Sequence, residues 1–147
     1  QPAFAGYLAD TTNYNSTGNG SERTLTSWTE LYDIGSNFTN GPGYFTAPVD
    51  GHYWVYCKTV LGGLTTSHAS SKFMIVTSNR TWSEWNINVG ATRDSNYNNI
   101  MIVSALVDMD AGDELRIKGN VYSGGQTVDF LADSSPNATY LNIRLMQ

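Results

Sequence analysis

The side chains that could carry chemistry in this sequence are few and widely spaced. His52 and His68 are its only histidines, and neither has a second His or Cys at the spacing of a zinc site. No G-x-S-x-G nucleophile elbow is present either. A Ser-His-Asp triad can assemble in space from distant positions, but no pattern here points to one. We therefore expect no catalytic residues and do not expect an enzyme.

The single cysteine cannot form a disulfide within the chain. Cys57 falls on the same predicted strand face as Tyr53 and Val55, whereas Lys58 points to the opposite face. A catalytic thiolate needs a basic neighbour, and free cysteine is among the most buried residue types. The pattern favours a small buried side chain over a nucleophile or an intermolecular bridge.

The densest acidic cluster surrounds a predicted turn and contains Asp108, Asp110, Asp113 and Glu114. Calcium prefers oxygen ligands of this kind, so the three aspartates are weak calcium candidates and calcium is the one cofactor the pattern allows. The spacing does not match a complete calcium loop. The alternative is a solvated turn capped by Asp side chains.

Trp82 and Trp85 are the candidates for ligand binding. They lie in the polar segment 81–86. In such a setting an aromatic face can stack on a sugar ring or act as an interface hot spot. The alternative is that both rings pack beneath a loop.

Five Asn-x-Ser/Thr triplets would be glycan acceptors in a secreted eukaryotic protein. A chain this rich in Asn, Ser and Thr also produces such triplets by chance, so they do not decide its compartment. The triplets begin at Asn15, Asn19, Asn37, Asn79 and Asn137.

The composition favours strands and excludes several partners. Charged residues make up 14% of the chain, against roughly 25% in an average protein, and aromatic residues make up 12%. Aromatic residues suit strands, and the Ser, Thr, Asn and Gly that replace the charges suit turns. A net charge of -5 with eight Lys and Arg residues gives no basic stripe for nucleic acid. No apolar run is long enough to insert into a membrane.

Alternating apolar and polar residues recur along the chain between turn signals. In segment 114–122, for example, three apolar residues alternate with three polar ones, namely Leu115, Ile117 and Val121 with Arg116, Lys118 and Asn120. The pattern predicts eight to ten strands and no helix longer than one or two turns. Such spacing is typical of an antiparallel sandwich or barrel, and we expect a single domain over residues 1–147.

One predicted strand, residues 100–109, is apolar on both faces. A sandwich strand buries only one face. The second apolar face indicates that the strand is either a central strand covered by a loop or part of a subunit interface. The same two alternatives apply to Trp54 and Tyr56, which lie on the outward face of their own strand.

Three segments resemble the globular head of the complement-1q-like family, whose fold is shared with tumour necrosis factor. The central segment is the most specific, with an aromatic pair, a Pro and a Gly at fixed offsets before a Tyr. The order and spacing of the three cover nearly the whole chain. They are residues 2–7 (PAFAGY), 43–53 (GYFTAPVDGHY) and 109–115 (MDAGDEL).

The resemblance implies an all-β, ten-strand antiparallel jelly-roll sandwich that assembles as a homotrimer. Together with the surplus apolar strand face, it predicts a trimer interface formed by Trp54, Tyr56, Met101, Val103 and Val107.

The implied function is a non-enzymatic recognition or attachment head at the C-terminal end of a longer fibrous protein. Such a head lies outside a cell or on a virion surface and binds a surface glycan or protein. The low charge and many Asn and Thr residues also resemble fibre or spike domains of phages and other viruses. Two alternatives stay open: a secreted innate-immune, lectin-like module, and a structural capsid or fibre decoration without a ligand.

Overall fold

The computed structural model describes residues 1–9 and 17–146, which form strands and no helix. No helix that could cross a bilayer is therefore found among them. The strands are β1 (Ala3–Leu8), β2 (Arg23–Thr24), β3 (Trp28–Ile34), β4 (Phe38–Thr39), β5 (Tyr44–Thr46), β6 (Gly51–Gly62), β7 (Ser71–Thr77), β8 (Thr81–Asn86), β9 (Asn99–Met109), β10 (Glu114–Val121), β11 (Asp129–Phe130) and β12 (Tyr140–Leu145).

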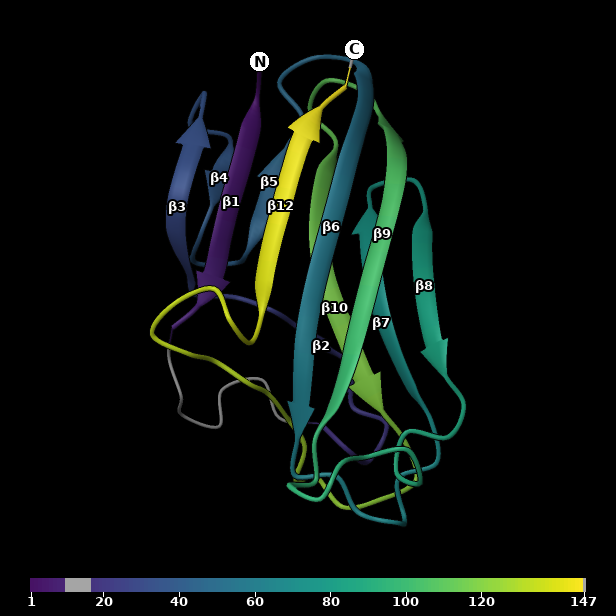
Figure 1. The fold of residues 1–147 in the computed structure, drawn as a ribbon. Helices are drawn as coiled ribbons and strands as arrows, with labels where there is room; N and C mark the ends of the chain where they lie inside the picture. Colours follow the sequence, from purple (N-terminus) through teal and green to yellow (C-terminus); the bar gives the residue numbers. More distant parts are fainter. Residues whose placement is uncertain (10–16, 147) are drawn as a thin grey trace.

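These strands form two antiparallel sheets packed face to face (Figure 1). The first sheet has the order β9-β6-β12-β1-β3, and the short β11 continues the β12 edge of β6. The second has the order β4-β5-β10-β7-β8, with the short β2 also on β10. Each layer therefore has five strands besides its two-residue extension, which confirms the predicted ten-strand jelly-roll sandwich.

The core lies between the two sheets and is rich in aromatic rings. Phe45 and Tyr53 meet edge to face with ring centroids 5.6 Å apart, and both are fully buried. The Tyr53 hydroxyl donates a hydrogen bond to the Val49 carbonyl at 2.8 Å. Buried Trp28 satisfies its indole N–H on the Leu25 carbonyl at 3.0 Å. Each large ring thus buries apolar area without leaving a polar atom unpaired.

The central segment 43–53 positions this core. Gly43 has a φ of 73°, and a Cβ there would lie 2.6 Å from the Leu25 carbonyl oxygen. The turn signal at Asp50-Gly51 predicts a special backbone angle at Gly51, but Gly51 is the first residue of β6 and lacks a positive φ. A Cβ at Gly51 would lie 2.6 Å from Cδ1 of Leu145, the end of a flexible side chain that can shift.

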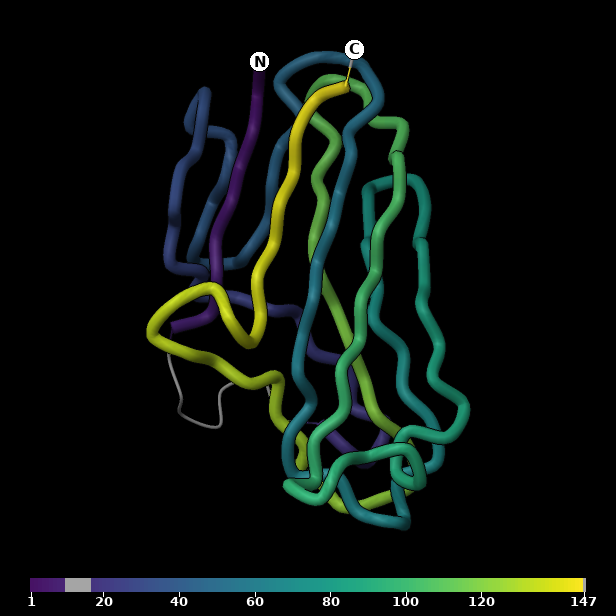
Figure 2. The backbone as a smooth tube through the Cα atoms, in the orientation of Figure 1, coloured from purple at the N-terminus to yellow at the C-terminus, as the bar shows by residue number. Residues whose placement is uncertain are grey.

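Both termini lie at one end of the sandwich (Figure 1). The opposite end, which we call the distal end, is built from the connections 63–70, 87–98 and 122–128 (Figure 2). Backbone hydrogen bonds tie these connections together: Gly90 N–H donates to the His68 carbonyl at 3.0 Å, and Leu64 N–H donates to the Tyr97 carbonyl at 3.0 Å. The loops of the distal end are therefore ordered against one another.

Candidate interaction surface

The outer face of the first sheet carries a row of stacked aromatic rings. Trp54 and Tyr56 follow each other on the outward side of β6, and Tyr140 lies beside them on β12. The ring centroids are 5.9 Å apart in both steps, with interplanar angles of 20° and 23°. Burial first, and then the adjacent Tyr140 hydroxyl, raise the pKa of Tyr56. The rings thus partly shield one another while their outer surfaces face solvent.

Cationic side chains flank this row. The Arg144 guanidinium lies 5.7 Å from the Trp54 ring centroid, and the Lys58 ammonium lies 5.7 Å from that of Tyr140. Cations at this distance are attracted to an aromatic face. The Lys58 ammonium also donates to the Asn137 carbonyl at 2.8 Å.

Strand β9 extends the aromatic row with aliphatic side chains. Leu106 is the register partner of Trp54, and Ile102 is that of Lys58. Their exposed fractions are 56% and 43%. We call the surface formed by Trp54, Tyr56, Tyr140, Leu106 and Ile102 the aromatic face. A cluster of exposed apolar side chains of this kind marks an interaction site more often than scattered apolar residues do.

A groove lies next to the aromatic face, where the edges of the two sheets meet. Strand β8 is an edge of the second sheet and β9 an edge of the first. The cavity between them measures about 420 Å³. We call it the edge groove; its lining residues are Glu84, Trp85, Asn86, Ile87, Ile100, Met101 and Ile102.

The prediction that Met101, Val103 and Val107 form a subunit interface is wrong. Their exposed fractions are 4%, 4% and 0%, and they belong to the core of their own protomer. The outward face of β9 is marked by polar Ser104 and Asp108, which the prediction did not use. The pairing of Val103 with buried Cys57 on β6 turns this set inward.

The other half of the interface prediction, Trp54 and Tyr56, does lie on the outer surface. Tyr140, Leu106 and Ile102, which accompany this pair on the surface, are not among the predicted interface residues. The signal was present for Leu106 and Ile102, since they alternate with the core-facing residues of the same strand.

Trp82 and Trp85 do not form one site. They are three residues apart on β8, so their side chains point to opposite faces of the strand. Trp82 packs against the core, whereas Trp85 is 52% exposed. The Lys72 ammonium lies 4.1 Å from the Trp85 ring centroid. Of the two ligand candidates, Trp85 offers the larger exposed surface, and Trp82 is partly buried.

Hydrogen bonds from backbone and side-chain N–H groups hold the acidic turn in place. The Asp113 carboxylate accepts hydrogen bonds from the Asp110 N–H at 3.0 Å and from the Asn79 amide at 2.8 Å. Asp108 instead lies on the sheet face, with its carboxylate 3.9 Å from the His52 ring. No group of three His, Cys, Asp or Glu side chains that could hold a metal occurs within the described ranges. The contacts of Asp113 fit the capped-turn interpretation.

His68 has a structural role. Its Nδ1 accepts the Thr65 N–H at 2.9 Å, and its Nε2 lies 3.0 Å from the Gly125 carbonyl oxygen. Because Nδ1 accepts a hydrogen bond, the ring is neutral and Nε2–H donates to Gly125. The Nδ1 bond stays within the connection 63–70, whereas the Nε2 bond joins it to the connection 122–128.

Cys57 is buried as predicted, with an exposed fraction of 0%. Burial raises the pKa of its thiol well above the usual value. A thiol in this state is a poor nucleophile.

The Asn-x-Ser/Thr asparagines use their side-chain amides in loop contacts. Asn15 lies outside the described residues. The Asn137 amide donates to Asp133 at 3.1 Å, which is also the first cause that lowers the pKa of the Asp133 carboxyl. The amides of Asn19, Asn37 and Asn79 also donate hydrogen bonds, to Gln126, Ile34 and Asp113.

No protein-family model and no curated protein matches this chain. Solved structures do match over its full length. The globular domain of zebrafish complement 1qA protein has a TM-score of 0.69 at 19% identity, covering 100% of this chain and 98% of that one. Murine APRIL at pH 8.5 has a TM-score of 0.63 at 12% identity, covering 99% and 98%. These similarities confirm the resemblance at the level of the fold.

Proposed function

We propose that this domain is a non-enzymatic, homotrimeric recognition head that acts outside a cell or on a virion fibre and binds a surface glycan or protein. The observation that carries the proposal is the aromatic face. A sandwich whose core is already complete gains nothing from exposing this surface unless another molecule covers it. The burial of one such leucine or isoleucine is worth about 1.5–3 kcal/mol.

A second copy of the chain is the partner that this surface fits best. The aromatic face and the edge groove are adjacent surfaces that share Ile102 on β9, and the groove combines apolar side chains with the polar Glu84 and Asn86. When one such surface binds a different surface on the next copy, the contact is heterologous, and it closes into a ring when the rotation allows. The resemblance to complement-1q-like and tumour-necrosis-factor-like heads supports a ring of three.

A recognition role fits the placement of the termini. Both lie at one end of the sandwich, so any flanking polypeptide would leave from that end and the distal end would face outward. The described histidines and the cysteine support a non-catalytic function. His68 and Cys57 are committed to loop and core contacts, and His52 faces only Asp108.

A matched pair of substitutions tests the assembly. Leu106→Asp places a carboxylate in the aromatic face, and Val49→Asp places one at a similarly exposed site (45%) outside it. Burial of an unpaired charge costs several kcal/mol, roughly 3–5. We therefore expect size-exclusion chromatography with light scattering to find monomeric Leu106→Asp and trimeric Val49→Asp.

The proposal would be contradicted if Leu106→Asp remained a trimer. It would also be contradicted if the unmodified protein had the monomer mass. A trimer that binds no surface ligand would instead favour the structural decoration alternative.

A further inference from the structure

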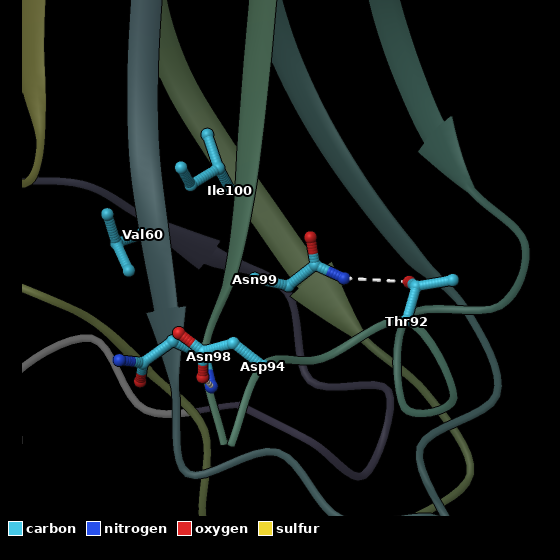
Figure 3. Close-up of a pocket in the computed structure, with 6 residues that line it drawn as sticks. All are labelled: Val60, Thr92, Asp94, Asn98, Asn99 and Ile100. Atoms are coloured by element: carbon cyan, nitrogen blue, oxygen red, sulfur yellow. Dashed lines mark hydrogen bonds between the residues drawn. The ribbon is translucent and has the colours of Figure 1, made fainter. Parts of the chain in front are cut away.

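A recess at the distal end combines an apolar wall with polar side chains that the core does not use. It lies where β6 and β9 meet the connection 87–98, and its volume is about 320 Å³ (Figure 3). This volume is at the lower end of the roughly 300–1,000 Å³ range of ligand pockets. The lining residues are Val60, Thr92, Asp94, Asn98, Asn99 and Ile100.

Asp94 both orders the loop and presents a free acceptor. Its Oδ1 accepts the Asn96 N–H at 2.9 Å and the Asn98 N–H at 2.8 Å. The backbone also closes here, because Asp94 N–H donates to the Asn98 carbonyl at 2.8 Å. No described residue donates to Oδ2 or bonds to the Asn98 side-chain amide. The recess therefore holds a fixed carboxylate oxygen and an amide that can donate and accept.

Thr92 and Asn99 form the opposite polar wall, as the dashed contact in Figure 3 shows. The Asn99 amide donates to the Thr92 hydroxyl oxygen at 2.8 Å, and that hydroxyl donates to the Asn88 carbonyl at 2.9 Å. No residue in the described part of the chain donates to the Asn99 side-chain oxygen, so this oxygen can accept a hydrogen bond from a ligand. Because Asp94, Thr92 and Asn99 are held in place before any ligand arrives, their ordering adds little to the cost of binding.

An exposed aromatic ring lies in the same loop, directly before Asn98 in the sequence, but it does not line the recess. Tyr97 is 59% exposed and has a φ of 66°. A non-glycine residue in this region is strained, and such strain concentrates at ligand sites. The Arg93 guanidinium lies 6.0 Å from the Tyr97 ring centroid and donates to the Gly90 carbonyl. The charge of Arg93 is therefore directed at these two groups, and Arg93 is not one of the recess-lining residues.

We propose that this recess binds a neutral pyranose sugar, such as a terminal hexose of a surface glycan. Sugar hydroxyls both donate and accept, which matches one carboxylate oxygen and two amides. The C–H face of the sugar ring matches the apolar side chains of Val60 and Ile100. Since a carboxylate and no cation lines the recess, it disfavours phosphate and other anions.

This inference rests on the proposed recognition function and names its ligand class and site. The recess lies away from both termini, at the end that the proposed head presents outward. It also differs from the predicted ligand site, because neither Trp82 nor Trp85 lines it.

The experiment is a titration of the ¹⁵N-labelled protein followed by amide chemical shifts. The probes are the methyl glycosides of galactose, glucose, mannose, fucose and N-acetylglucosamine. Nα-acetyl-lysine amide serves as a cationic probe and inorganic phosphate as an anionic one. We expect at least one glycoside to shift the amides of residues 92–100 in a saturable way, and phosphate to have no effect.

Three variants locate the site. Asp94→Asn keeps an oxygen that can accept the two loop N–H groups but removes the charge. Asn98→Ala removes the free amide. Each should weaken glycoside binding at least about fivefold, the loss of one hydrogen bond. Asp110→Asn makes the same change as the first variant on an exposed carboxylate near the termini and should bind as the unmodified protein does.

The inference is overturned if no glycoside shifts these amides, if binding is unaffected by both recess variants, or if only the lysine probe binds. Sedimentation of the same samples separates this result from the assembly. A trimer that binds no sugar would support the proposed self-association and overturn the sugar site. A monomer that binds sugar would support the sugar site and overturn the self-association.

Discussion

Folding disfavours the ionised form of the Asp129 carboxyl group. It lies on the short strand β11, and its Oδ1 is enclosed without a hydrogen-bond donor among the described residues. Burial raises the pKa of Asp129 above its ordinary value of 3.8. A raised pKa in a carboxyl group means that the folded state holds its proton to a higher pH than the unfolded state does.

We predict that Asp129→Asn stabilises the protein at neutral pH. As the pH rises above 3.8, the unfolded state loses its Asp129 proton first, so the free energy of unfolding falls until the folded carboxyl has also ionised. Asparagine avoids this loss. The gain should be below about 1 kcal/mol, because the carboxyl is partly solvated.

Urea denaturation of both proteins near pH 3.5 and near pH 7 measures this difference. The gain should be present at the higher pH and vanish at the lower. An equal effect at both values would show that the enclosed carboxylate oxygen is not responsible.

At the residue scale, the sequence predicts whether a side chain is buried better than it predicts whether that side chain binds a ligand. Cys57 is buried as predicted because its neighbours Tyr53 and Val55 show which strand face points inward. The sugar recess has no comparable signal. Asp94 and Asn98 sit in a polar loop that resembles every other polar loop of the chain until its hydrogen bonds are known.

Strand β9 shows where sequence reasoning fails at the scale of an element. The faces of β6 could be distinguished because polar His52 and Lys58 mark the outward side. In β9 the outward face carries polar Ser104 and Asp108, whereas the inward positions from residue 101 to residue 109 are all apolar. The prediction counted only the apolar residues of each face and did not use this difference. The surplus apolar surface was therefore correctly noticed and placed on the wrong side of the strand.

Two adjacent substitutions test the assignment of β9. Val103→Asp should cost about 3–5 kcal/mol of folding free energy, because it buries an unpaired carboxylate. Ile102→Asp, at a position 43% exposed in the protomer, should cost the isolated protomer less than about 1 kcal/mol.

Both variants are compared by chemical denaturation at low protein concentration, where association contributes little. If Ile102→Asp were the more damaging change to the protomer, the inward and outward faces of β9 would be reversed.

At the scale of the molecule, the fold was predictable because several signals agree. Turn residues separate the strands of alternating pattern. The segment 43–53 supplies Phe45 and Tyr53, whose rings pack against each other in the core. The surface proposed for assembly was harder to predict from the sequence. Surface residues contributed by β6, β9 and β12 come together only after the sheet has formed, so no local pattern contains the aromatic face.

The central claim is that copies of this chain cover one another's aromatic faces. Sedimentation equilibrium of the unmodified protein over a wide concentration range tests it most directly. The account predicts a single species with three times the 16.1 kDa mass of the chain. A species that stays at 16.1 kDa up to the highest concentration would contradict it.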